Sequence, residues 1–338
     1  MKSRKKIAGI RRALLCGTFA LAGTMLIGPV QAFALDKIIF GTDWLAEGEH
    51  GGYYQAEANG IYKRYGLDVA IRPGGPQVNN PQLLASGAVD IVILTGLQAL
   101  RFANEGVPLV AIAAFYQKNP QILMAHKSQG LKTLADLKGR PIMVSFFARD
   151  AFWPWLREKY GFTDGQIRPY TFNLGPFLHD PTAIQQGFVT NEPFTAAAAG
   201  SDPQAFLLAD YGYEDYAALA TVRRDEIETK RDVLQRFVNA TILGWKTFLH
   251  GDPMPAFNLI KSANPDMTMT GMKNSREGLI KYGVVESGDA EKLGIGAMTN
   301  TRWKALFESM VKAGMYKPDM HYKAAYDLSF VDRGFDSK

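Results

Sequence analysis

The chain has 338 residues, a formal net charge of +5 and a single cysteine, Cys16. Six basic residues and no acid lie in the first 34 residues, so the rest of the chain carries a net charge of about −1, which argues against a nucleic-acid surface. Without cysteine, that part of the chain has no disulfide, no thiolate nucleophile and no cysteine metal site.

The N-terminal segment has the pattern of a secretory signal peptide. Basic residues between positions 2 and 12 precede an apolar run over residues 13–30, which ends in small residues at Ala32 or Ala34. A retained membrane anchor is the alternative, but the run is short for a span of ~20 residues. Leu15 occupies a position where a lipoprotein cleavage site needs a small residue, so a lipid anchor at Cys16 is not expected. We therefore expect cleavage after Ala32 or Ala34 and export to the periplasm.

The next part of the chain alternates between strand and helix patterns. Strands are predicted over residues 37–40, 69–71, 90–94 and 109–115, and helices over 81–85 and 97–104. The continuous apolar run of residues 90–94 is typical of a strand that is buried on both faces. This alternation predicts a parallel α/β sheet.

A second unit of the same kind begins near Ile122. Helices are predicted over 134–137 and 151–160, and strands over 141–144 and 188–189. Residues 207–209 and 217–222 could then carry the chain back to the first unit. The clearest helix covers residues 231–250, where large apolar residues recur at helical spacing. About 304 residues exceed a typical single core, so two lobes are expected. A helical stretch over 303–311 is assigned to the first lobe.

Several short segments together resemble a known family. They are Asp43-Trp44 with HGGYY at 50–54, GIYKRYGLDV at 60–69, GGPQV at 74–78, LLASGAVDI at 83–91 and GFVTNEPF at 187–194. In order and spacing they are similar to solute-binding proteins of ABC importers. The subfamily includes binders of thiamine-pyrimidine precursors, riboflavin, nitrate, alkanesulfonates and taurine. The similarity covers residues 36 to 250 and weakens afterwards.

This resemblance implies an α/β fold of the type II periplasmic binding protein class. Two α/β lobes would be joined by two crossing strands, near residues 116–123 and 211–220, with the ligand cleft between the lobes. Residues 35–120 with 218–338 would form one lobe and residues 121–217 the other. The resemblance also implies a monomer that delivers a small-molecule ligand to an ABC transporter permease in the inner membrane.

Candidate ligand-binding residues follow the predicted strands, because ligands of α/β sheets bind beyond the carboxyl ends of the strands. Asp43 and Trp44 follow the first strand, Thr95 follows the third and Phe146 follows a strand of the second lobe. The full set of candidates is Asp43, Trp44, His50, Tyr54, Gly75, Thr95, Phe146, Asn173 and Glu192.

The chemistry of this set favours a nitrogen heteroaromatic ligand. Trp44, Tyr54 and Phe146 offer flat faces, and ring stacking adds ~0.5–1.5 kcal/mol beyond burial. Asp43 and Glu192 could accept hydrogen bonds from an amino-heterocycle, and the resemblance implies that pyrimidine binders use a glutamate at the position of Glu192. Sulfonate, nitrate or phosphate would need positive charge or dense donors. The candidate loops offer only Arg72 and Arg149 at their margins and the Gly74-Gly75 backbone.

Each candidate also has a structural interpretation. Asp43 could cap a helix, Trp44 could belong to the core, and His50 could be a structural histidine. One of Tyr53 and Tyr54 is expected to pack internally, and Phe147 could replace Phe146. Glu192 precedes Pro193 and could cap the next helix.

An enzymatic role is the main alternative of another class. The chain is similar to the eukaryotic thiamine-pyrimidine synthase, whose cofactor lysine and consumed histidine align with Leu94 and Gln98. Leu94 cannot form a Schiff base, so that mechanism is excluded. The sequence predicts no catalytic residue, cofactor or metal site. A ligand-sensing protein is a further alternative.

Overall fold

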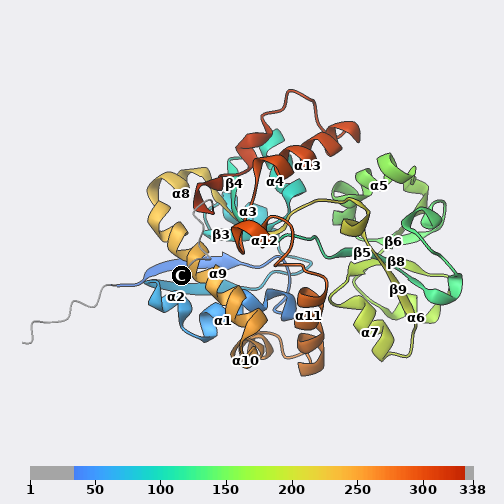
Figure 1. The fold of residues 1–338 in the computed structure, drawn as a ribbon, viewed down its shortest axis with the longest axis horizontal. Coiled ribbons are helices and arrows are strands. Elements are labelled where there is room, and N and C mark those ends of the chain that lie inside the picture. Colours follow the sequence, from blue (N-terminus) through green and yellow to red (C-terminus); the bar gives the residue numbers. More distant parts are fainter. Residues whose placement is uncertain (1–33, 332–338) are drawn as a thin grey trace, which may run out of the picture. The chain divides into compact units, whose positions relative to one another are not determined.

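The computed structural model describes residues 34–331, of which Leu35 onward belongs to one compact unit (Figure 1). The predicted signal peptide lies outside the described residues apart from its last residue, Ala34. Within residues 34–331, every helix is too short or too polar to cross a membrane.

The first sheet has five strands in the order β2-β1-β3-β10-β4. They are β1 (Asp36–Gly41), β2 (Leu67–Arg72), β3 (Ile91–Leu94), β4 (Leu109–Tyr116) and β10 (Ala217–Arg223). β1 is parallel to β2 and β3, whereas β10 is antiparallel to both β3 and β4. The four strands predicted between residues 37 and 115 therefore run in the same direction, as expected, and the returning strand β10 is inserted antiparallel between β3 and β4.

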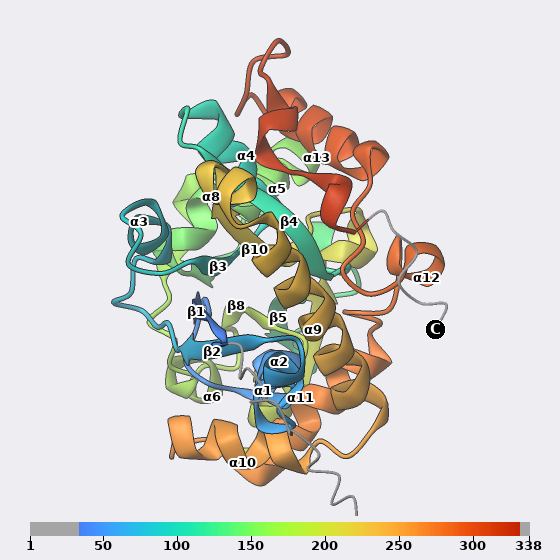
Figure 2. The same ribbon diagram turned by 90° about the vertical axis from the view of Figure 1, so that its left-hand side faces the viewer.

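Helices on this sheet close around a shared apolar core. They are α1 (Gly51–Ala58), α2 (Ile61–Arg64), α3 (Asn80–Ala85), α4 (Gly96–Asn104), α8 (Arg224–Thr229), α9 (Arg231–His250) and α10 (Met254–Ala263). Figure 2 shows α9 beside α1 and α2, and α9 contacts both. The buried face of α9 carries Phe237, Trp245 and Phe248, as its apolar periodicity predicts.

The pair Gly51-Gly52 lets α1 approach α9 closely. A Cβ atom on Gly51 would lie 2.0 Å from the Phe248 ring, and one on Gly52 would lie 2.1 Å from the Trp245 ring. Real Cβ atoms do not approach other heavy atoms so closely, so any side chain here would force the helices apart. The glycine pair is thus explained by helix packing.

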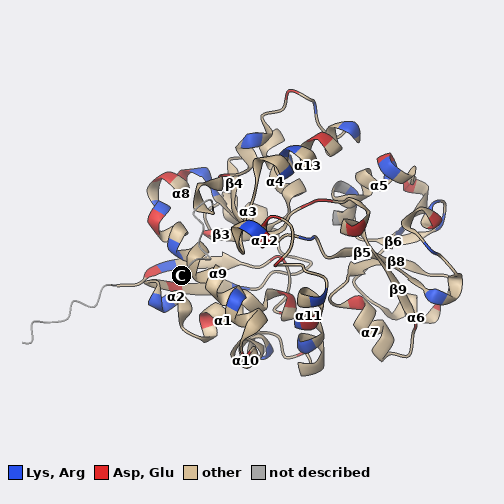
Figure 3. Cartoon of the chain, in the orientation of Figure 1, with Lys and Arg blue, Asp and Glu red and all other residues tan. Residues whose placement is uncertain are grey.

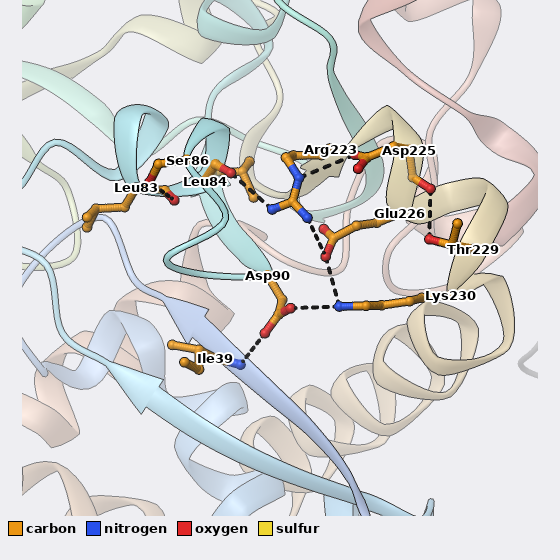
Figure 4. A network of polar contacts seen from close by, with 10 residues as sticks. All are labelled: Ile39, Leu83, Leu84, Ser86, Asp90, Arg223, Asp225, Glu226, Thr229 and Lys230. Atoms are coloured by element: carbon orange, nitrogen blue, oxygen red, sulfur yellow. Dashed lines mark hydrogen bonds and ion pairs between the residues drawn. The ribbon is translucent and has the colours of Figure 1, made fainter.

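A charged network fixes the start of α9 to the first sheet (Figure 4). The Lys230 ammonium lies 3.0 Å from Asp90 Oδ1 and 3.0 Å from Glu226 Oε1. Asp90 also accepts a hydrogen bond from the Ile39 backbone N–H of β1 at 2.8 Å. Arg223, at the end of β10, lies 3.0 Å from Glu226.

The second sheet has the order β7-β6-β8-β5-β9. Its strands are β5 (Gln121–His126), β6 (Ile142–Val144), β7 (Ile167–Pro169), β8 (Ile184–Phe188) and β9 (Pro203–Leu207). Its helices are α5 (Phe152–Tyr160), α6 (Gly175–His179) and α7 (Glu192–Ala198). β8 begins earlier than predicted. β9 ends at Leu207, and a 3-10 turn, Leu208–Tyr211, follows it on the way back to the first sheet.

The chain passes between the sheets twice, once from β4 to β5 and once from β9 to β10. Three further helices follow: α11 (Met269–Lys281), α12 (Ala290–Leu293) and α13 (Asn300–Lys312). α13 contacts α4 of the first sheet and α5 of the second, and α11 contacts α7. The C-terminal helices therefore touch elements of both sheets, and the division into lobes at residues 120 and 217 stays a prediction.

Candidate ligand-binding site

A cavity lies where the two crossings meet the carboxyl ends of several strands. The cavity is open to solvent. Asp43 follows β1, Thr95 follows β3, Tyr116 ends β4 and Phe188 ends β8, as expected for a ligand site of α/β sheets. Its main lining side chains are Asp43, Glu47, Glu49, His50, Thr95, Tyr116, Asn119, Gln121, Phe152, Phe188, Tyr213 and Asp215.

Three of the predicted site residues line this cavity: Asp43, His50 and Thr95. His50 is buried, and its Nε2 lies 2.9 Å from Oδ1 of the exposed Asp43. Thr95 caps α4, because its hydroxyl oxygen accepts a hydrogen bond from the Gln98 N–H while the Gln98 side chain accepts one from the Thr95 N–H. Gln98 is thus engaged in helix capping.

Two of the predicted aromatic residues lie elsewhere. The half-buried Trp44 contacts the Phe172 ring, with centroids 4.7 Å apart, and does not line the cavity. Phe146 is 73% exposed on the turn after β6. The expected sandwich of a ligand between Trp44 and Phe146 therefore has no counterpart in this arrangement.

The remaining first-sheet and loop candidates also lie outside the lining. Tyr54 is buried in the core next to Tyr53, so both tyrosines pack internally. Gly75 has a φ of 147°, which favours glycine, and Leu45 is its nearest neighbour. Asn173 is exposed, and its side-chain oxygen accepts a hydrogen bond from the Gly175 N–H at 2.8 Å.

Glu192 stands behind the cavity wall and holds a residue that lines it. Its Oε2 accepts a hydrogen bond from the Phe188 N–H at 2.6 Å, and its Oε1 accepts one from the Tyr170 hydroxyl at 3.3 Å. Burial raises the pKa of Glu192 to about 7, against the opposing effect of the Phe188 N–H bond. At the start of α7, this carboxyl fixes the end of β8 beside the cavity.

Glu49, which the sequence reasoning did not select, joins three segments at the cavity. Its Oε1 accepts a hydrogen bond from the Thr190 hydroxyl at 2.9 Å, and its Oε2 accepts one from the Ser275 hydroxyl at 3.0 Å. Its backbone carbonyl accepts a bond from the Tyr116 hydroxyl at 2.5 Å. Burial raises the pKa of Glu49. This carboxyl thus links the turn after β1 to the segment after β8 and to α11.

Asp215 performs a similar task between the two crossings. Oδ1 accepts a hydrogen bond from the Leu97 N–H at 3.1 Å, and Oδ2 accepts bonds from Asn119 at 3.2 Å and from the Tyr213 hydroxyl at 3.3 Å. Burial raises the pKa of Asp215 to about 7, although these bonds oppose the shift. The resemblance implied crossings near residues 116–123 and 211–220, with the ligand cleft between the lobes that they join. Asn119, Tyr213 and Asp215 lie in these crossings, so their position could have identified them as lining residues.

The cavity lining is rich in carboxyl groups, and His50, which pairs with Asp43, also belongs to it. Four carboxyl groups line it, those of Asp43, Glu47, Glu49 and Asp215, with no lysine or arginine among the described lining residues. Figure 3 shows the blue lysine and arginine residues mainly on helices and loops, away from the strands. Residues 34–331 contain no group of three or more histidine, cysteine, aspartate or glutamate residues placed to hold a metal ion. Such a lining favours donors, and in particular amino groups, over anions.

Comparison with known proteins identifies relatives along most of the chain. A protein named for thiamine biosynthesis in Haemophilus influenzae is 31% identical over 254 residues, which cover 72% of this chain and 78% of that protein. The riboflavin-binding protein RibY of Chloroflexus aurantiacus is 21% identical and covers 94% of this chain and 92% of its own. The formylaminopyrimidine-binding protein of Halalkalibacterium halodurans is 23% identical, with coverage of 67% and 70%.

A synthase matches over a shorter stretch. The 4-amino-5-hydroxymethyl-2-methylpyrimidine phosphate synthase of Schizosaccharomyces pombe is 30% identical over 108 residues, or 32% of this chain and 31% of the synthase. The three relatives that match over a greater length comprise two binding proteins and the protein named for thiamine biosynthesis.

Solved structures share the fold. A protein from Bordetella bronchiseptica superimposes with a TM-score of 0.66 at 16% identity, over 88% of this chain and 96% of that one. The alkanesulfonate-binding protein SsuA of Xanthomonas axonopodis, bound to MOPS, gives a TM-score of 0.61 at 11% identity, over 87% and 98%. The expected periplasmic-binding-protein fold is confirmed. A sequence model described as NMT1/THI5 like matches residues 47–255, and the chain belongs to that family.

Proposed function

We propose that this protein is an extracytoplasmic solute-binding protein that captures a small nitrogen heteroaromatic and delivers it to an ABC permease. The ligand class we favour is an aminopyrimidine, such as a thiamine-pyrimidine precursor. The observation that carries this proposal is the cavity lining, where carboxyl groups and aromatic rings occur together without a lysine or arginine. The formylaminopyrimidine-binding relative supports the same class.

The lining suits a flat ligand that carries hydrogen-bond donors. Carboxyl oxygens can accept bonds from exocyclic amino groups, and Asn119 and Gln121 add amide groups. Tyr116, Phe152 and Phe188 offer ring surface to a heteroaromatic. A sulfonate or nitrate would meet carboxylates without a compensating cation, so an anionic ligand is disfavoured.

Capture would involve closure of the two predicted lobes about the crossings. Glu49 and Asp215 belong to the cavity lining and also bond to segments on more than one side of it. Ligand binding and lobe closure would therefore act on the same side chains. The predicted signal peptide supports a periplasmic location, and we propose that the protein acts as a monomer. We assign no reaction to the site.

A thermal-shift screen of the chain from residue 35 tests the proposal. The panel contains aminopyrimidines, nucleobases, riboflavin, alkanesulfonates, taurine and nitrate. Ligand at 100 times its dissociation constant stabilises by ~2.7 kcal/mol, which raises the melting temperature by roughly 5 °C. We expect such a shift with amino-heterocycles. A shift only with sulfonates, taurine or nitrate, or only with riboflavin, would overturn the proposed ligand class.

A further inference from the structure

Glu47 is a buried carboxyl group in the cavity wall that has no hydrogen-bond partner. It lines the cavity and is only 8% exposed. It precedes the 3-10 turn Gly48–His50, and its side chain makes no capping bond there. Its backbone carbonyl accepts a hydrogen bond from the His50 N–H at 3.0 Å, but no donor among residues 34–331 bonds to its carboxyl oxygens. The nearby His50 is engaged with Asp43 through Nε2.

The other buried carboxyls around the cavity are all bonded. Glu49 accepts bonds from two hydroxyls, Asp215 accepts bonds from three donors, and Glu192 accepts bonds from a backbone N–H and a tyrosine hydroxyl. Buried polar groups without partners are rare and costly, and each needs a reason. Glu49, Asp215 and Glu192 each hold other segments in place through hydrogen bonds, whereas the carboxyl group of Glu47 holds none.

Its surroundings also disfavour a lone negative charge. Burial, followed by the carboxyl groups of Glu49, Asp43 and Glu192, raises the pKa of Glu47 well above its usual value. A ligand that brings either a basic nitrogen or an acceptor for the carboxyl proton would relieve this cost.

We propose that Glu47 is the specificity-determining residue of the cavity and pairs with a heteroaromatic edge in which an amino group adjoins a ring nitrogen. The inference rests on the proposed function and narrows its ligand class. A neutral carboxyl group donates its O–H to the ring nitrogen and accepts an N–H from the amino group. If the proton resides on the ring instead, the carboxylate accepts both N–H bonds. In both forms, the carboxyl group and the ring nitrogen share one proton, and two hydrogen bonds join Glu47 to the ligand.

Isothermal titration calorimetry with simple probes tests this pairing. The probes are 4-aminopyrimidine, pyrimidine without the amino group, and 4-(dimethylamino)pyrimidine, which lacks the N–H donors. We expect the unaltered protein to bind 4-aminopyrimidine roughly ten-fold or more tightly than the other two, because a bond to a buried charged group is lost with each. Equal affinity for 4-aminopyrimidine and its dimethylated analogue would overturn the pairing without any mutation.

The variant Glu47→Met completes the test. Methionine keeps the length of the side chain but lacks the donor and the acceptor of the pair, both of which a glutamine amide would retain. Glu47→Met should lose affinity for 4-aminopyrimidine by about ten-fold or more and lose the preference over pyrimidine. Its melting temperature should be unchanged or higher, because an unpaired buried carboxyl is removed. Glu158→Met, the same change at an exposed position of α5, is the matched control and should bind as the unaltered protein does.

The outcomes separate this inference from the proposed function. If Glu47→Met keeps both affinity and preference while the unaltered protein binds 4-aminopyrimidine, the role of Glu47 is wrong and the proposed function stands. If the unaltered protein binds none of the three probes and responds to anions instead, both are overturned.

Discussion

At the scale of single residues, Asp215 links the pH to the stability of the fold. Its pKa is raised from its usual value of 3.8 to about 7 by burial. A carboxyl with a raised folded-state pKa binds its proton more tightly in the folded state than in the unfolded state. Its stabilising effect is complete below pH ~4 and is lost as the pH rises to about 7.

We therefore expect the free energy of unfolding to fall between pH 4 and pH 7, with Glu192 contributing in the same direction. Asp215→Asn should flatten this pH dependence, because the titrating group is removed. Urea unfolding at several pH values measures the slope. The control is Asp202→Asn, whose carboxylate is 71% exposed in an ion pair with Lys127. Identical slopes for Asp215→Asn and the unaltered protein would contradict the expectation.

Three of the candidate site residues lie at the cavity, and local sequence explains their positions. Asp43 follows β1, His50 lies at the start of α1, and Thr95 lies between β3 and α4. These backbone positions place the three residues at the cavity. Glu47 and Glu49 were missed although they lie in the same stretch, because composition suggests exposure for an acid. The buried carboxyl of Glu49 is held by Thr190 and Ser275, which come from far along the chain.

At the scale of elements, the contact between α1 and α9 is set by glycines from both helices. A Cβ on Gly52 would meet Trp245 at 2.1 Å, and one on Gly244 would meet the Gly52 carbonyl at 2.4 Å. Gly52→Ala should lower the free energy of unfolding by about 1–3 kcal/mol or more through overpacking. Chemical denaturation measures this loss.

Gly165→Ala is the control for that prediction. Its nearest neighbour would lie at 3.7 Å from the added Cβ, so the change should cost little. A Gly52→Ala variant as stable as Gly165→Ala would mean that the helices adjust without strain, and the packing explanation would then fail.

Element boundaries could be predicted where hydrophobic periodicity is strong. The helix predicted over 231–250 coincides with α9, whose apolar residues recur along one face. β8 was shortened in the prediction because Gln185 and Gln186 interrupt its apolar pattern, yet both are buried in the second sheet. The neighbouring strands bury these two glutamines, and the hydrophobic pattern of the local sequence does not predict such burial.

At the scale of the whole molecule, Glu49 bonds the cavity wall to the segment after β8, and we propose that this bond takes part in lobe closure. The Thr190 hydroxyl is fully buried and donates to Glu49. Thr190→Val keeps the shape of the side chain and removes this donor. We expect the ligand-free protein to open more readily, which lowers the apparent ligand affinity several-fold, since only the closed fraction retains ligand.

Small-angle X-ray scattering with and without ligand, together with calorimetry, measures both effects. Thr301→Val, at an exposed position of α13, is the matched control. If Thr190→Val left both the ligand-free radius of gyration and the affinity unaltered, Glu49 would not couple the cavity to closure.

The position of β10 in the first sheet has a consequence for the order in which the chain can fold during synthesis. In the strand order, β4 has only β10 as its neighbour, and β10 also completes the pairing of β3. A ribosome makes β4 about a hundred residues before β10. Until residue 223 has emerged, the buried apolar strand β4 has no edge to join, whereas all five strands of the second sheet are already present. A chain that folds as it emerges would therefore complete the second sheet before the first, although the first sheet begins earlier in the sequence.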